Sequence, residues 1–238
     1  MKTVAIFGAG PGAGFATARR FGREGFRVAL VARSGERVAA FAKELAGEGI
    51  EAEAFPADLG DLDTHARVVD AVTARFGGID VAVINGFLPY EAIRPILELD
   101  VEAMRDVLRG TVLAPISLTR LILPGLREKG DGALLYGLGL SAKTPAPPLA
   151  APGSGQAGLR NYIHNLHTVL APEGVYAGAL TIGKLVQGSD AQVLFDRSVE
   201  ARHGFDPERV EPAELAERYW ELYTRRERAE ITVGELAA

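Results

Sequence analysis

The stretch that most limits the possible folds of this chain is 4–18, which reads VAIFGAGPGAGFATA. It starts with a short apolar run, turns through closely spaced glycines and continues into a helical pattern. Glycines allow a tight turn and let the backbone approach a pyrophosphate, and the free N–H groups at the start of the next helix favour an anion. We therefore predict a nucleotide phosphate site, formed by Gly8, Gly10, Gly12, Ala13 and Gly14.

The rest of the chain alternates between apolar runs and helical patterns, with about one strand for each helix. The run at 27–33 is almost entirely apolar, which is typical of a strand buried on both faces of a parallel sheet. We predict an α/β fold: a Rossmann-type, doubly wound parallel sheet of about seven strands with helices on both faces. No repeat or linker divides the sequence, so we predict one domain, 1–238, with a helical insertion at about 184–210.

Two regions are expected to depart from this regular alternation. Residues 101–126 form a long helical pattern that contains Pro115 and Pro124. Because proline lacks an N–H group, we expect a bend at Pro115 and a kink or an end at Pro124. Residues 138–155 are rich in glycine, proline, alanine and serine, so we predict a loop there.

The composition argues against several classes of function. The net charge of the chain is -5, whereas a nucleic-acid backbone requires a basic partner surface. The chain has no cysteine, which excludes disulfides and thiolate metal sites, and its four histidines are too dispersed to predict a metal site. No apolar run approaches the length of about twenty residues that a membrane span needs, so we expect a cytoplasmic protein that binds neither membranes nor nucleic acids.

The motifs at the strand ends resemble those of the short-chain dehydrogenase/reductase family, and the resemblance covers nearly the whole chain. They comprise the glycine turn after the first strand, an acidic-apolar pair after the third, Asn-Gly after the fourth and a glycine after the sixth. The residues that carry the resemblance are Gly8, Gly12, Gly14, Asp58, Leu59, Asn85, Gly86 and Gly183. The resemblance implies that they hold a dinucleotide cofactor, with the acidic-apolar pair at its adenine.

The end of the second strand is where a dinucleotide fold selects its cofactor. An acid there accepts the ribose 2′-OH of NAD, whereas an arginine accommodates the 2′-phosphate of NADP. Arg33 and Ser34 supply a guanidinium and a hydroxyl at this place, no acid accompanies them, and Arg37 follows one helical turn later. We therefore predict that NADP(H) is favoured over NAD(H).

The family's catalytic residues are a Tyr-x-x-x-Lys pair, a serine after the fifth strand and an asparagine in the preceding helix. The tyrosine transfers the carbonyl proton, the lysine lowers its pKa and holds the ribose, and the serine polarises the substrate oxygen. By the resemblance, these positions are occupied here by Pro152, Gln156, Gly139 and Thr111. Proline has no proton to transfer and glutamine has no charge, although Gln156 retains the ability to hydrogen-bond a ribose hydroxyl. No tyrosine of the chain has a lysine four residues later.

Three residues are candidates for the missing acid/base work: Ser141, Ser154 and Lys184. Tyr136 and Lys143 have the Tyr-x6-Lys spacing of enoyl reductases, but they fall at a strand end and in a loop. Three functions stay open at this point. The chain is a reductase or dehydrogenase of a hydrophobic small molecule with non-standard acid/base groups, a catalytically inactive NADP(H)-binding sensor or partner protein, or a non-redox enzyme on the same fold.

The expected assembly follows from the same resemblance. Members of the family are commonly homo-oligomers through two long helices, which correspond here to 101–126 and 156–170. We therefore expect a homodimer or homotetramer. His164 and His167 lie on one face of the second of these helices, where we expect no carboxylate partner.

Overall fold

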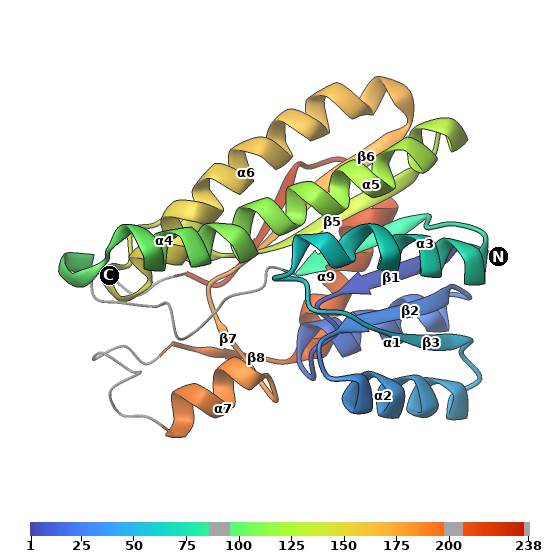
Figure 1. Cartoon of the computed structure of the whole chain (residues 1–238), viewed down its shortest axis with the longest axis horizontal. Coiled ribbons are helices and arrows are strands. Elements are labelled where there is room, and N and C mark those ends of the chain that lie inside the picture. Colours follow the sequence, from blue (N-terminus) through green and yellow to red (C-terminus); the bar gives the residue numbers. More distant parts are fainter. Residues whose placement is uncertain (86–95, 198–206, 236–238) are drawn as a thin grey trace.

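The computed structural model describes residues 1–85, 96–197 and 207–235 (Figure 1). The described α-helices are α1 (Ala13–Arg23), α2 (Gly35–Gly47), α3 (His65–Phe76), α4 (Val101–Leu108), α5 (Ala114–Lys129), α6 (Ala150–Leu170), α7 (Asp190–Arg197) and α9 (Pro212–Arg225). The described strands are β1 (Thr3–Phe7), β2 (Arg27–Ala32), β3 (Ala52–Pro56), β4 (Val81–Asn85), β5 (Gly132–Gly139), β6 (Val175–Ile182), β7 (Leu185–Val186), β8 (Arg209–Val210) and β9 (Glu230–Val233).

Seven of these strands form one parallel sheet in the order β3-β2-β1-β4-β5-β6-β9. Val4 of β1 is paired with Val28 of β2 on one side and with Val81 of β4 on the other. The strand order therefore reverses between β1 and β4, and ligands of such sheets bind in the crevice at this point. The predicted doubly wound α/β fold of about seven strands is confirmed.

Helices cover both faces of the sheet, which explains why its central strands are apolar on both sides (Figure 1). On one face, α1, α2 and α9 contribute side chains such as Phe21, Leu45 and Tyr219 to the core. On the other, α3, α5 and α6 contribute side chains such as Leu118 and Ile163. Full burial of each such side chain contributes about 1.5–3 kcal/mol, so the two layers anchor the strand ends firmly.

The long helical region is divided by a wider turn. α4 and α5 are joined by a π-helical segment, Arg109–Leu113, directly before Pro115. The irregularity thus lies where a bend was expected, because proline has no N–H group for the regular bonding pattern. The helix does not end at Pro124: this residue lies inside α5, which continues to Lys129.

The same region corrects the expectation about membrane spans. Among the described residues, the helical stretch Val101–Lys129 is long and apolar enough to cross a membrane by length and composition. In the fold, however, Leu118, Ile122 and Leu126 of this stretch are buried in the core. Its apolar character is therefore explained by packing over the sheet.

The predicted loop at 138–155 is shorter than expected. β5 continues to Gly139, two short 3-10 turns follow, and α6 begins at Ala150. Pro152 lies in the first turn of α6, where N–H groups have no partner within the helix and proline is tolerated. The described part of the predicted insertion contains α7, and it is bracketed by the pairing of β7 with β8.

Candidate functional site

The glycine turn brings the start of α1 close to the end of β1. Gly8 has a φ of +88°, a left-handed conformation that side chains rarely adopt. A Cβ atom on Gly14 would lie 2.6 Å from the carbonyl oxygen of Gly8 and 3.0 Å from the Cα of Ala9. Only glycine therefore allows this close approach of helix and turn.

Gly10 of the turn leaves room for a ligand. A Cβ atom on Gly10 would meet no described protein atom within 4 Å. Among the described residues, no side chain caps the N-terminus of α1 at Gly12, and its first turn contains no acidic residue. The first N–H groups of this helix, beginning at Ala13, are therefore suited to an anion such as a pyrophosphate.

The adenosine end of the site lies where β2 leads into α2. Arg33 and Ser34 follow β2 and are exposed. Ser34 caps α2, because its Oγ accepts a hydrogen bond from the N–H of Arg37 over 3.3 Å. The Arg37 guanidinium forms an ion pair of 2.7 Å with Asp190, the first residue of α7. Sequence analysis missed Asp190, since nothing in the sequence links these two helices.

The acidic-apolar pair after β3 is held by local contacts. Asp58 Oδ1 accepts the N–H of Gly60 over 2.9 Å, and the Leu59 side chain is buried in the core. His65 Nε2 lies 3.1 Å from the carbonyl oxygen of Leu59, and its Nδ1 lies 3.0 Å from Ser117 Oγ. A carbonyl only accepts, so Nε2 carries the proton and Nδ1 accepts from the serine. Burial lowers the pKa of His65, which favours this neutral form.

At the end of β4, Asn85 lies beside the glycine turn. A Cβ atom on Gly8 would lie 3.1 Å from the Cβ and the carbonyl oxygen of Asn85. The Asn85 side-chain oxygen accepts a hydrogen bond of 2.9 Å from the hydroxyl of buried Tyr219. Its amide nitrogen is buried without a hydrogen-bond partner in the described structure. Such an unpaired donor in the crevice is consistent with a polar ligand there, whereas Gly86 lies outside the described residues.

The fold brings together Gly139 and Gln156, the residues expected from the sequence at the positions of a catalytic serine and lysine. Gln156 Oε1 accepts a hydrogen bond of 2.8 Å from the N–H of Gly139. A Cβ atom on Gly139 would lie 3.1 Å from this Gln156 oxygen and 3.5 Å from Ser141 Oγ. The Gln156 amide and the Ser141 hydroxyl therefore both approach the point where a side chain at residue 139 would begin.

The remaining two positions lie in the same part of the molecule. Thr111 is fully buried, and its hydroxyl donates to the carbonyl oxygen of Val107 over 2.7 Å. A Cβ atom on Gly155 of α6 would lie 2.7 Å from Thr111 Oγ1. Pro152 is buried in the first turn of α6. Glycines in this helix thus permit tight packing against the turns that carry Thr111 and Ser141.

Several other sequence candidates have different surroundings. Ser154 is exposed, and its hydroxyl donates to Ala150 within its own helix. The Lys184 ammonium pairs with Glu208 over 2.8 Å and faces a polar hollow of about 540 Å³ beside α9 and β9. Tyr136 is fully buried, and its hydroxyl lies 2.7 Å from Thr119 Oγ1, so burial raises its pKa. Tyr136 does not form a catalytic pair with Lys143, which instead donates to Thr232.

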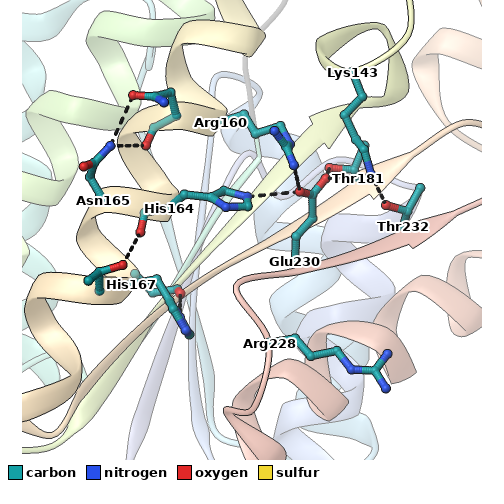
Figure 2. Close-up of polar contacts among 12 residues, drawn as sticks. Lys143, Arg160, His164, Asn165, His167, Thr181, Arg228, Glu230 and Thr232 are labelled. Atoms are coloured by element: carbon teal, nitrogen blue, oxygen red, sulfur yellow. Dashed lines mark hydrogen bonds and ion pairs between the residues drawn. The ribbon is translucent and has the colours of Figure 1, made fainter.

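A charged cluster links α6 to the edge strand β9 (Figure 2). Glu230, only 8% exposed, accepts hydrogen bonds from Arg160 over 2.8 Å and from Thr181 over 2.7 Å, and its Oε2 lies 3.0 Å from His164 Nε2. The expectation that His164 has no carboxylate partner was therefore wrong. Burial alone would raise the pKa of Glu230, but these hydrogen bonds lower it to about 2.

The cluster also fixes the segment that carries Ser141. Lys143 Nζ lies 3.0 Å from Thr232 Oγ1 and 3.6 Å from Glu230, so both contacts tie this segment to β9. Gly183, at the end of β6, packs closely on Leu140, since a Cβ atom there would lie 2.5 Å from Leu140 Cδ2.

Among the described residues, no group of three His, Asp or Glu side chains is arranged to hold a metal ion.

Comparisons with known proteins find relatives of one family. A family model described as short chain dehydrogenase matches residues 2–192. A fatty acyl-CoA reductase of Mycobacterium tuberculosis is 31% identical over 183 residues, which are 75% of this chain and 61% of the relative. Dehydrogenase/reductase SDR family member 4 of Sus scrofa is 26% identical over 198 residues, or 82% of this chain and 69% of the relative. The chain thus spans less than two thirds of the mycobacterial relative.

Solved structures show the same fold. An actinorhodin polyketide ketoreductase with NADPH superimposes with a TM-score of 0.85 at 25% identity, and the match covers 98% of this chain and 95% of the ketoreductase. A short-chain dehydrogenase from Rhodopseudomonas palustris gives a TM-score of 0.79 at 23% identity and 98% coverage of both chains. Nearly the whole chain therefore has the architecture of these proteins.

Proposed function

The chain belongs to the short-chain dehydrogenase/reductase family of NAD(P)-dependent oxidoreductases, and from that premise we propose that it is an NADP(H)-dependent reductase or dehydrogenase of a hydrophobic small molecule. The observation that carries the proposal is the geometry of the glycine turn, with its close packing at Gly14 and its open space at Gly10. When bound, the cofactor supplies or accepts the hydride. The protein itself must orient the cofactor and the substrate and provide for the transfer of one proton to or from the substrate oxygen.

The proposed cofactor contacts follow the ends of the strands. The turn and the first N–H groups of α1 bind the pyrophosphate, and Arg33 and Ser34 bind the 2′-phosphate. The segments after β3, β4 and β6 and the start of α6 bind the adenine, ribose and nicotinamide. The proposed ligands are Gly8, Gly10, Gly12, Ala13, Gly14, Arg33, Ser34, Asp58, Leu59, Asn85, Gly86, Gln156 and Gly183.

We further propose that Ser141 takes over the polar contact to the reacting oxygen. Its Oγ lies 3.5 Å from the point where a side chain at residue 139 would begin. Neither Gly139 nor Pro152 has a proton to transfer, and Gln156 uses its side-chain oxygen on the N–H of Gly139. Ser141 therefore orients the substrate oxygen by donating a hydrogen bond, and a water molecule delivers the proton.

Replacement of Ser141 by alanine is expected to lower kcat/KM about a hundredfold, because it removes a donor that acts on the developing charge. Ser154→Ala is the matched control, since its exposed hydroxyl bonds within its own helix, and it should retain activity within about twofold. The measurement is steady-state turnover of carbonyl substrates with NADPH. Equal losses in the two variants would contradict the role of Ser141.

The cofactor proposal is tested by binding. Fluorescence titration of the protein with NADPH and NADH should give a lower Kd for NADPH, and Arg33→Gln should remove most of the difference because it removes the guanidinium. Equal affinity of the wild type for both nucleotides would contradict the preference. Bound NADPH without transfer of its hydride to any carbonyl compound would contradict the oxidoreductase part of the proposal.

A second candidate function is a catalytically inactive NADP(H)-binding sensor or partner protein. It is favoured by the hydrogen bond from the N–H of Gly139 to Gln156, which places the Gln156 oxygen where a catalytic serine side chain would start. It requires that the double variant Pro152→Tyr with Gln156→Lys leaves the cellular role intact. A non-redox enzyme is the third possibility, and a product of unchanged oxidation state would identify it.

The remaining proposals concern assembly and location. We propose a single domain over 1–238 that forms a homodimer or homotetramer through the long helices, where Leu113, Leu121 and Val169 are exposed. The mycobacterial relative is named as a reductase of fatty acyl-CoA, which supports a hydrophobic substrate here. We propose a cytoplasmic protein without nucleic-acid or membrane partners, in keeping with its net charge of -5.

A further inference from the structure

Asp190 places a carboxylate at the adenosine end of the site, although neither Arg33 nor Ser34, the two residues directly after β2, is an acid. Its Oδ2 lies 2.7 Å from Nη1 of Arg37, in the first turn of α2. The backbone of Arg37 is itself fixed, because its N–H donates to the hydroxyl of Ser34. The carboxylate therefore approaches the cluster of residues proposed to bind the 2′-phosphate.

A second contact shows that the segment before Asp190 lies against the glycine turn. A Cβ atom on Gly12 would lie 3.0 Å from the Cβ of Ser189 and 3.1 Å from Cγ1 of Val186. The hydroxyl of Ser189 also donates to the carbonyl oxygen of Val186 over 2.7 Å and accepts the N–H of Gln192, which orders this segment. The start of α7 is thus held between the phosphate turn and α2.

We propose that Asp190 is a specificity-determining residue of the cofactor site. Its carboxylate lowers the affinity for a nucleotide with a 2′-phosphate relative to one without it. This inference rests on the proposed binding of NADP(H). In dinucleotide folds, an acid that accepts the ribose 2′-OH usually lies about 20 residues after the glycine motif. Here α7 supplies the acid from a distant part of the chain. The site consequently combines an arginine that favours NADP with a carboxylate that favours NAD.

The physical basis is competition for one guanidinium. A phosphate monoester carries a charge of about −1.5 to −2 at pH 7 and pairs strongly with arginine. A 2′-phosphate near Arg37 must either displace Asp190 or share the guanidinium with it, and the two anions repel each other. The side chains of Arg37 and Asp190 are 42% and 59% exposed, so this ion pair contributes little to stability. Breaking it to bind a phosphate therefore costs little free energy.

The test uses nucleotides without a nicotinamide, so its readout is binding and not activity. Adenosine 2′,5′-bisphosphate and adenosine 5′-monophosphate differ only in the 2′-phosphate. We expect Asp190→Asn to lower the Kd of the bisphosphate about threefold to tenfold and to leave or raise that of the monophosphate. Isothermal titration calorimetry of the full chain measures both. In an Arg37→Gln background, the same substitution should have a smaller effect, because only the repulsion between the carboxylate and the 2′-phosphate is then removed.

Asp196→Asn is the matched control, because Asp196 lies on the same helix but pairs with Arg209 over 2.8 Å. It should change neither dissociation constant. An unchanged or weaker affinity of Asp190→Asn for the bisphosphate would overturn the role of Asp190. If Asp190→Asn did not fold, Asp190→Ser would be measured in its place. A wild type that binds neither probe would instead contradict the proposed cofactor site itself, and the inference with it.

Discussion

Replacement of Gly14 by alanine should weaken NADPH binding about a hundredfold and lower the free energy of unfolding by about 2 kcal/mol. The added Cβ would lie 2.6 Å from the carbonyl oxygen of Gly8 and 3.0 Å from the Cα of Ala9. Both contacts are with backbone atoms, so α1 must move away from the turn, and overpacking of this kind costs about 1–3 kcal/mol. A displacement of about 1 Å in groups that position a ligand can cost about a hundredfold. Fluorescence titration and urea unfolding measure the two effects.

Two other glycines provide controls for this prediction. Gly47 ends α2, and a Cβ atom there would meet no described atom within 4 Å, so Gly47→Ala should keep both stability and affinity. Gly10→Ala should also fold normally, since its Cβ meets no described atom, but it should bind the nucleotide less well if the pyrophosphate lies over Gly10. An affinity of Gly14→Ala equal to that of the wild type would rule out the proposed position of the phosphates.

Replacement of Glu230 by glutamine should lower the free energy of unfolding by about 3 kcal/mol at pH 7. Burial would raise the pKa of this carboxyl, but hydrogen bonds from Arg160, Thr181 and His164 lower it from 4.5 to about 2 in the folded chain. Each pKa unit corresponds to about 1.4 kcal/mol, which gives the expected magnitude. Glutamine preserves the shape but leaves the cations around it without a counter-charge.

The pH dependence of this effect has a definite sign. Because the folded pKa of Glu230 is below the unfolded value, its contribution is fully present above about pH 4.5 and is lost as the pH falls through 4.5 towards 2. The difference in free energy of unfolding between the wild type and Glu230→Gln should therefore shrink over this pH range. Urea unfolding between pH 7 and pH 3 measures it, with Glu128→Gln on the surface of α5 as the control. Equal stabilities at pH 7 would contradict the prediction.

Sequence patterns predicted the architecture because the signals for it are local. The fully buried strands β1, β2 and β4 are continuous apolar runs, and a helical pattern follows each of β1, β2 and β3 in the chain. The start of α6 was missed, because glycine and proline argue against a helix in general. In the first turn, however, the N–H that Pro152 lacks is not needed. The division of the long helix was expected near Pro115, but its form as a wide turn was not.

The candidate site was predictable only where its residues are neighbours in the sequence. The glycine turn and Arg33 are recognised from residues next to each other in sequence. The partners of Glu230 come from α6, β6 and the segment after β5, and Asp190 meets Arg37 across two distant helices. Such contacts depend on the packing of whole elements, and no short sequence pattern records them. The same holds for Ser141, whose position beside Gly139 follows from the close approach of α6.

The wide turn at Arg109–Leu113 has a consequence for how this part of the chain can vary. A regular helix rotates by about 100° per residue, so a turn that holds one residue more changes the direction in which the two halves face. Val107 of α4 packs with Ala151 of α6, whereas Leu118 of α5 faces the sheet. Loss of a single residue from this turn would make the helix regular. α4 would then be rotated relative to α5, so that they could not face α6 and the sheet at the same time. The number of residues in this turn is therefore tightly constrained.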